Sequence, residues 1–233
     1  MWPRGKLIAL EGIDGSGKRT QLGLLAHALD ARGLPTMRIS FPRYESFFGK
    51  LVARYLNGDF GPLEAVDPHF SALLYAGDRF EAKAELDAAL AAGKIVLADR
   101  YIGSNLAHQT SRVTPERREA FLAWLKHLEY SLYGLPVEDL VVYLRVPAAE
   151  AHRLIGLKSA REYTALRRDL QEADVSHLEQ AAEVYDHLAT EKNWVRIDCS
   201  NMASGELSSP EEIHQVLLKT VESRILSRAS AGQ

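Results

Sequence analysis

Gly12-Ile13-Asp14-Gly15-Ser16-Gly17-Lys18 is the stretch that decides how this chain folds, and it matches the pattern G-x-x-x-x-G-K. The apolar run Leu7 to Leu10 precedes it, and helical periodicity follows from Lys18 to Arg32. Glycines let the backbone curl so that successive N–H groups point at an anion, and the helix adds the positive end of its dipole. Because a strand before and a helix after are the context that this motif requires, the sequence predicts a loop that binds the phosphates of a nucleotide.

Lys18 supplies a mobile positive charge for the outer phosphates. The motif usually has Ser or Thr next, as a Mg²⁺ ligand, but here Arg19 follows, and a guanidinium cannot ligate a metal. We therefore expect Mg²⁺ to depend on water, substrate phosphates and carboxylates such as Asp14 and Asp99, with Thr20 behind them. The residues expected to bind the donor nucleotide are Gly12, Ile13, Asp14, Gly15, Ser16, Gly17, Lys18, Arg19 and Thr20.

Short apolar runs alternate with amphipathic stretches along the rest of the chain. After the first strand, at residues 6–10, we expect strands at 36–41, 95–98, 140–146 and 195–197, and helices at 47–56, 67–92, 115–133 and 210–226. This alternation predicts an α/β three-layer sandwich with a five-stranded, mainly parallel sheet, like that of P-loop NTP hydrolases. We expect a single domain over residues 1–233, with a frayed tail at 227–233.

Residues 151–174 break this alternation, because they are rich in Arg and Lys and poor in large apolar side chains. We expect a helical lid segment over a site rather than a core helix. Asp169 and Glu172 lie on one helical face of this segment. A solvated run of charges is the alternative interpretation.

The composition narrows the class of protein. A net charge of −3 gives no general attraction to nucleic acid polymers or anionic membranes, so phosphate binding must be local. The single cysteine, Cys199, permits no intramolecular disulfide, and we interpret it as a buried filler. No apolar run approaches the roughly 20 residues of a membrane span, and Leu7 to Leu10 is too short for a signal peptide. We expect a cytoplasmic location.

Polar side chains follow two of the predicted strands. Asp99 and Arg100 come directly after 95–98, and 41–44 follows the second strand. Ligands of open parallel sheets bind outside the carboxyl ends of the strands, which puts these residues beside the loop. Tyr75 and Arg79 lie four residues apart on one helical face, and a flat ring with a fork of donors suits a base, although ordinary surface packing is the alternative.

This mixture of residues favours phosphoryl transfer, which needs positioning, cationic charge and a metal. A phosphate acceptor is already anionic, so no general base is needed, and the lack of an obvious catalytic His or Cys is consistent with that chemistry.

From about residue 6 to 200 the chain resembles the thymidylate kinase family in several ordered motifs. They are Glu11-Gly-Ile-Asp-Gly-Ser-Gly-Lys-Arg-Thr-Gln21, Phe41-Pro-Arg-Tyr44, Tyr75-Ala-Gly-Asp-Arg79, Asp99-Arg-Tyr-Ile-Gly-Ser-Asn105 and Asp169-Leu-Gln-Glu-Ala-Asp174. This set is far more specific than the loop alone. Some members of the family also carry arginine after the loop lysine, so Arg19 is a variant within it.

The resemblance implies transfer of the ATP γ-phosphate to dTMP, with Mg²⁺, giving dTDP, by a homodimer packed through long helices. Lys18, Arg100 and Asp14 would be the catalytic residues, and the metal candidates are Asp14, Asp99 and Asp169. The lid candidates are Arg153, Lys158 and Arg161.

For the acceptor, the resemblance places Arg100 on the phosphate, Tyr75 on the face of thymine, Arg79 at a base carbonyl and Asn105 at the Watson–Crick edge. His108 stands where a tyrosine or other bulky group often excludes a ribose 2′-hydroxyl. The full set of expected acceptor residues is Asp14, Phe41, Pro42, Arg43, Tyr44, Tyr75, Arg79, Arg100, Ser104, Asn105, His108 and Glu172.

Three alternatives stand beside a dTMP kinase. One is another nucleoside monophosphate kinase, acting on dUMP, CMP or AMP. Another is a kinase-like nucleotide-binding protein with weak activity. The third, a GTPase-like switch, would need an Asn-Lys-x-Asp guanine reader, and no asparagine in this chain is followed by lysine.

Overall fold

The computed structural model describes residues 4–156, 175–200 and 206–227. Within them lies a five-stranded sheet of order β2-β3-β1-β4-β5, in which every pairing is parallel. The strands are β1 (Lys6–Glu11), β2 (Thr36–Ser40), β3 (Ile95–Asp99), β4 (Leu140–Arg145) and β5 (Trp194–Asp198). Each lies where the sequence predicts it, with ends that differ by at most one residue. The predicted α/β class is confirmed.

The central strands are apolar because both faces of the sheet are covered. Leu7 to Leu10 in β1 and Ile95 to Ala98 in β3 are 0% exposed. Continuous apolar runs of this kind are typical of parallel strands buried on both sides. At the edge of the sheet, β2 is only partly buried, and fewer of its side chains are apolar. The core therefore lies around β1 and β3, directly beneath the glycine-rich loop.

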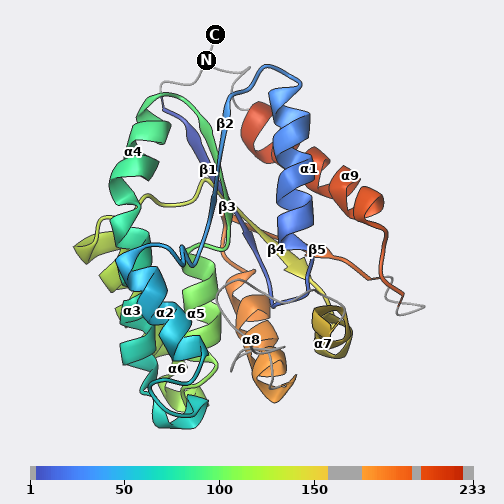
Figure 1. Ribbon diagram of the computed structural model, residues 1–233. Helices are drawn as coiled ribbons and strands as arrows, with labels where there is room; N and C mark the ends of the chain where they lie inside the picture. Colours follow the sequence, from blue (N-terminus) through green and yellow to red (C-terminus); the bar gives the residue numbers. More distant parts are fainter. Residues whose placement is uncertain (1–3, 157–174, 201–205, 228–233) are drawn as a thin grey trace.

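Helices lie on both faces of this sheet (Figure 1). On one face α1 (Lys18–Asp30) packs against α9 (Pro210–Val221), and on the other α4 (Lys83–Ala91) packs against β3. The remaining helices gather toward the end of the sheet at which the strands finish (Figure 1). They are α2 (Phe47–Leu56), α3 (Pro68–Glu81), α5 (Ile102–Thr110), α6 (Arg118–Lys126), α7 (Ala148–Gly156) and α8 (Val175–Leu188).

Shorter helical pieces complete the described chain. They are the 3-10 turns η1 (Leu63–Ala65) and η2 (Pro115–Arg117) and the π-helical stretches η3 (His127–Leu132) and η4 (Glu222–Leu226). The helix expected over 115–133 is thus η2, α6 and η3 in succession. No helix in the described ranges is both long and apolar enough to cross a membrane.

The long helix predicted over 67–92 begins as expected and is then interrupted. The Asp67 side chain accepts a hydrogen bond from the backbone N–H of His69 at 2.7 Å, and Pro68 occupies the first turn. The N–H of the buried Ala82 then bonds to the carbonyl of Arg79, three residues back, at 3.0 Å. This tight turn separates α3 from α4, so the prediction of a single long helix is wrong. Two further helices, α5 and α8, were not predicted, and α7 overlaps the start of the helical segment expected from residue 151.

The segment expected to be a lid, 151–174, begins inside the core. Ala151 and Ile155 of α7 are 0% and 3% exposed and belong to the main apolar cluster, so one side of this helix packs into the core while Arg153 is exposed. Small and apolar side chains on one face of α7 allow this packing. Residues 157–174 lie outside the described ranges, as do 228–233 of the expected tail.

Cys199 is 1% exposed, and burial raises the pKa of its thiol to about 12. The interpretation of this residue as a buried filler is confirmed.

A buried carboxyl group precedes β4. Glu138 is 4% exposed, and burial raises its pKa to about 8 although its Oε2 accepts a hydrogen bond from the Tyr130 hydroxyl at 2.8 Å. Nearby Glu11 and Glu129 act in the same direction as burial. The folded protein therefore holds a proton on Glu138 at neutral pH, whereas the unfolded chain releases it near the ordinary value of 4.5.

Because the folded state binds this proton more tightly, the free energy of unfolding falls as pH rises from about 4.5 to about 8, by at most roughly 1.4 kcal/mol per pH unit. Glu138→Gln keeps the shape without the titration, so we expect a flatter dependence in that window. Urea unfolding of both proteins at pH 5, 6, 7 and 8 measures the difference. Parallel pH profiles for the two proteins would contradict the assignment.

Candidate active site

The glycine-rich loop joins β1 to α1, and its shape depends on glycines. Gly12, Gly15 and Gly17 have φ angles of 140°, 88° and 84°, which side chains disfavour. A Cβ on Gly12 would lie 2.6 Å from the Leu144 carbonyl oxygen, and one on Gly15 would lie 2.4 Å from that of Ala151. The loop therefore packs directly on β4 and α7.

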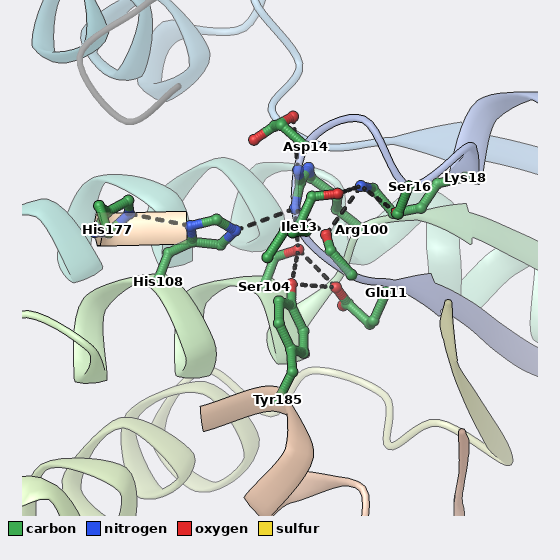
Figure 2. A network of polar contacts seen from close by, with 11 residues as sticks. Glu11, Ile13, Asp14, Ser16, Lys18, Arg100, Ser104, His108, His177 and Tyr185 are labelled. Atoms are coloured by element: carbon green, nitrogen blue, oxygen red, sulfur yellow. Dashed lines mark hydrogen bonds and ion pairs between the residues drawn. The ribbon is translucent and has the colours of Figure 1, made fainter. Parts of the chain in front are cut away.

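Lys18 lies inside the curve of this loop. It is 7% exposed, and its Nζ donates to the carbonyls of Gly12 and Ile13, each at 2.9 Å, and to Ser16 Oγ at 3.3 Å (Figure 2). The loop thus surrounds one ammonium group with its own oxygens. This places a positive charge at the concave side of the loop, where the sequence predicts phosphates.

Arg100 follows β3 with a φ of 65°, and it is the one non-glycine residue of the described chain with a positive φ. Such conformations are strained and cluster at functional sites. Its Nη2 lies 2.8 Å from Asp14 Oδ1, and its Nη1 donates to Ser104 Oγ at 2.8 Å and to the Gly12 carbonyl at 3.1 Å. Burial alone would lower the pKa of Arg100, but Asp14 foremost holds it well above its ordinary value. The guanidinium stays charged beside the loop.

Glu11 binds the segments around Arg100 through its buried carboxylate, and no role was predicted for this residue. Its carboxylate is 0% exposed and accepts from the Tyr101 N–H at 2.7 Å. It also accepts from Ser104 Oγ at 2.6 Å and the Tyr185 hydroxyl at 3.1 Å (Figure 2). Burial, and then Glu11, raise the pKa of Tyr185 well above its ordinary value, so the phenol remains a donor. The sequence signal that could have identified Glu11 is its charge directly after the apolar run Leu7 to Leu10, as for Asp99 after 95–98.

A second group of polar side chains lies on α3, α5 and η3. Arg79 Nε and Nη2 donate to the two oxygens of Glu129 at 2.5 and 2.7 Å, and Asn105 Nδ2 donates to Glu129 Oε1 at 2.8 Å and to the Ala72 carbonyl at 3.0 Å. All three side chains are at most 2% exposed. Burial would lower the pKa of Arg79, but Glu129 raises it, so the guanidinium stays charged.

The amide of Asn105 has a defined orientation. Its two described partners are acceptors, so the nitrogen must face them and the oxygen must face elsewhere. Asn105 Oδ1 is buried and accepts no hydrogen bond from any described residue. Buried acceptors are almost always satisfied, so this one marks a place for a donor. Sequence reasoning chose Arg79 and Asn105 but missed Glu129, which shows no local signal within its helix.

The segment 41–44 is fixed to α3 through Asp78. This carboxylate, 1% exposed, accepts from the Arg43 N–H at 2.8 Å and from Ser46 Oγ at 2.7 Å. The Arg43 side chain points toward Glu85 of α4, with 3.9 Å between Nη1 and Oε2. Asp78 thus holds the loop after β2 beside the helix that carries Arg79.

The aromatic residues of this region pack on their neighbours. The Phe41 ring lies 5.9 Å from that of Tyr101, and the Tyr75 ring meets Tyr55 edge-on at 6.3 Å. Tyr44 and Tyr75 are partly buried against a small cluster around Val52 and Leu74.

The other predicted residues are more scattered. Arg19 and Thr20 are exposed on the first turn of α1, and Arg153 is exposed on α7, where it bonds to Glu150 at 2.5–3.1 Å. Asp99, partly exposed at the end of β3, also helps to hold the Arg100 charge. Four predicted residues lie outside the described ranges: Lys158, Arg161, Asp169 and Glu172.

The described residues supply only part of a ligand set for Mg²⁺. Asp14 and Asp99 offer the hard oxygens that this ion prefers. Across 4–156, 175–200 and 206–227, however, no three His, Cys, Asp or Glu side chains gather in a way that could hold a metal. The donor set suits an ion held mainly by phosphate oxygens and water, with one or two carboxylates.

The contact between Gly15 and Ala151 generates a prediction with a matched control. Gly15 and Gly17 share a left-handed conformation, but a Cβ on Gly17 would meet nothing within 4 Å. We expect Gly17→Ala to cost roughly 1 kcal/mol of strain, and Gly15→Ala to cost more and to raise the KM for ATP about tenfold, because the loop must move off α7. Thermal unfolding and initial rates measure both effects. Equal losses in the two variants would show that the contact with α7 is unimportant.

Comparison with known proteins agrees with this geometry. A family model described as thymidylate kinase matches residues 10–208. The thymidylate kinase of Mycobacterium tuberculosis is 33% identical over 186 residues, which cover 79% of this chain and 86% of that protein. The thymidylate kinase of Plasmodium falciparum is 27% identical over 221 residues, covering 94% of this chain and 90% of the other.

A solved structure of thymidylate kinase from Candida albicans shares the fold, with a TM-score of 0.74 at 20% identity. The match covers 94% of this chain and 92% of that one. The human thymidylate kinase is 34% identical over 148 residues, 64% of each chain. With a family model that spans most of its length, this chain belongs to the thymidylate kinase family.

Proposed function

We propose that this protein is a kinase domain that transfers the γ-phosphoryl group of ATP to dTMP, giving dTDP, with Mg²⁺. Membership of the thymidylate kinase family supports this reaction. The choice of acceptor rests on the buried group Arg79, Glu129 and Asn105, in which the Arg79 guanidinium offers a donor and Asn105 Oδ1 an acceptor. We also propose that the domain extends over 1–233, with a lid contributed by residues within 151–174.

Thymine presents an O4 acceptor next to an N3–H donor. The described contacts of Arg79 use Nε and Nη2, which leaves Nη1 to donate to O4, while Asn105 Oδ1 can accept from N3–H. Cytosine and adenine present the opposite order, a ring-nitrogen acceptor next to an amino donor. With either of them, two buried polar groups would remain unpaired, which a site of this kind rejects strongly. Tyr75, one turn before Arg79, would cover the base.

The phosphate end of the acceptor would meet Arg100. Its guanidinium lies between the loop carbonyl of Gly12 and the carboxylate of Asp14, so donor and acceptor phosphates would approach each other there. Lys18 would hold the outer donor phosphates. Positioning and electrostatic stabilisation are the main catalytic contributions in phosphoryl transfer, and these residues supply both.

Mg²⁺, when bound, would neutralise charge on the transferred group. Asp14 and Asp99 are the described carboxylates that would reach it, and Asp169 is a further candidate outside the described ranges. Glu172, Lys158 and Arg161 remain predicted contacts for the same reason, and the 41–44 segment and His108 remain predicted neighbours of the acceptor. The cytoplasmic location also remains a prediction.

A panel of monophosphates with ATP and Mg²⁺ tests the acceptor. We expect kcat/KM to be highest for dTMP and on the order of 10²-fold or more higher than for dCMP or AMP, because those bases invert the donor and acceptor order. The matched pair is dUMP and dCMP, which have similar shape and differ at the edge that Arg79 and Asn105 would read. Initial rates of ADP release give the values. Faster turnover of dCMP or AMP than of dTMP would disprove the proposal.

We further propose a homodimer that packs through α3. Phe70, Leu73 and Phe80 lie along one side of α3 and are 44%, 38% and 49% exposed. Leu132 of η3 is 67% exposed, and its neighbour Tyr133 stacks near Phe80 with ring centroids 4.9 Å apart. Large apolar side chains gathered on one surface are typical of interaction sites.

If the dimer packs through α3, a charge introduced on this apolar surface should separate the two subunits. Phe80→Glu would place a carboxylate in the middle of the apolar contact, so we expect a monomer at micromolar concentrations. Val216→Glu is the matched control, because Val216 is 50% exposed on α9, on the opposite face of the sheet (Figure 1). Sedimentation velocity reports the mass of each protein. A dimer in both variants, or a monomeric parent protein, would refute this interface.

A further inference from the structure

Two buried histidines meet beside Arg100. His108 of α5 and His177 of α8 are 4% and 3% exposed, and 3.3 Å separates His108 Nδ1 from His177 Nε2 (Figure 2). The other nitrogen of His108, Nε2, lies 3.5 Å from Arg100 Nη1. The pair thus leads from the first turn of α8 to the guanidinium that faces the loop.

The chemistry of arginine fixes the direction of the hydrogen bonds from Arg100 through His108 to His177. Arg100 can only donate, so His108 Nε2 must be the acceptor. A neutral His108 then carries its proton on Nδ1 and donates it to His177 Nε2. Burial foremost, and then the charge of Arg100, lower the pKa of His108 well below its ordinary value, which agrees with a neutral ring. Both ring nitrogens of His108 therefore have a defined role.

The pair gives Arg100 a neutral acceptor. The other described acceptors of Nη1 are closer and also uncharged, the Gly12 carbonyl at 3.1 Å and Ser104 Oγ at 2.8 Å, so His108 at 3.5 Å shares the two Nη1 protons with them. Nη2 faces the carboxylate of Asp14. Neutral acceptors orient a guanidinium without cancelling its charge. A group that must bind a dianionic phosphate benefits from that arrangement.

We propose that His177 is a positioning residue for the acceptor phosphate: it sets the tautomer and ring orientation of His108, which in turn orients Arg100. This inference rests on the proposed function, because it assumes that Arg100 binds the phosphate of a nucleoside monophosphate. His177 touches neither ligand in this proposal and acts only through His108.

Two substitutions at His177 separate the hydrogen bond from the packing. His177→Phe keeps a flat ring and removes the acceptor, and we expect the KM for dTMP to rise about 5- to 10-fold while the KM for ATP stays within about twofold. His177→Gln keeps an acceptor and should stay near the parent value. Leu178→Met is the control for disturbed packing, since Leu178 is the fully buried neighbour on the same turn. An equal rise in both KM values in His177→Phe would overturn the proposal.

A double-mutant cycle tests the route through His108. If His177 acts only through that ring, adding His177→Phe to His108→Phe should leave the KM for dTMP unchanged. Additive effects would overturn the proposal.

The tautomer can be measured on the parent protein alone, without an activity assay. ¹⁵N NMR of the parent protein should show His108 neutral with its proton on Nδ1, and a proton on Nε2 would overturn the inference. If dTMP is not a substrate, the proposed function fails, whereas the tautomer still reports separately on the histidine pair.

Discussion

The buried carboxylate of Glu11 joins β1 to two segments that are far apart in the sequence, residues 101–104 and α8. It accepts hydrogen bonds from the Tyr101 backbone at the end of β3, from Ser104 on α5 and from Tyr185 on α8. A buried carboxylate is costly unless donors surround it, so these segments must come together around Glu11 for the fold to be stable. Arg100, in its strained conformation, directly precedes Tyr101, whose N–H makes the first of these contacts. The position of the cation beside the loop therefore depends on a fully buried carboxylate.

The two buried arginines of the site differ in how their charge is balanced. Arg79 forms a two-point ion pair with Glu129, so the pair has no net charge and suits an uncharged base. Arg100 has one carboxylate, Asp14, on Nη2 and neutral acceptors on Nη1. Its charge is thus less fully balanced, which suits a phosphate. The same side chain serves two kinds of recognition because its neighbours differ.

The strands and the loop could be predicted because their signals are local. Apolar runs, Gly12 to Lys18 and the polar residues after β3 lie within a few positions of one another, and the structure places them as expected. Asn105 and Arg79 could be chosen from the motifs, but not their common partner. Glu129 and Tyr185 act through tertiary contacts with residues 50 and 174 positions away, and no pattern in their own helices distinguishes them.

The beginning of the expected lid shows where local reasoning fails for a physical reason. Basic composition suggested that 151–174 would lie over the site, yet the first turns of α7 contribute Ala151 and Ile155 to the core. This helix also lies against the loop, because a Cβ on Gly15 would meet the Ala151 backbone. Composition averages over a segment and cannot show that one face of a short helix is buried. Arg153 is consequently carried by a helix anchored in the core and in contact with the loop, so any contact that it makes with a donor nucleotide is made from a fixed base.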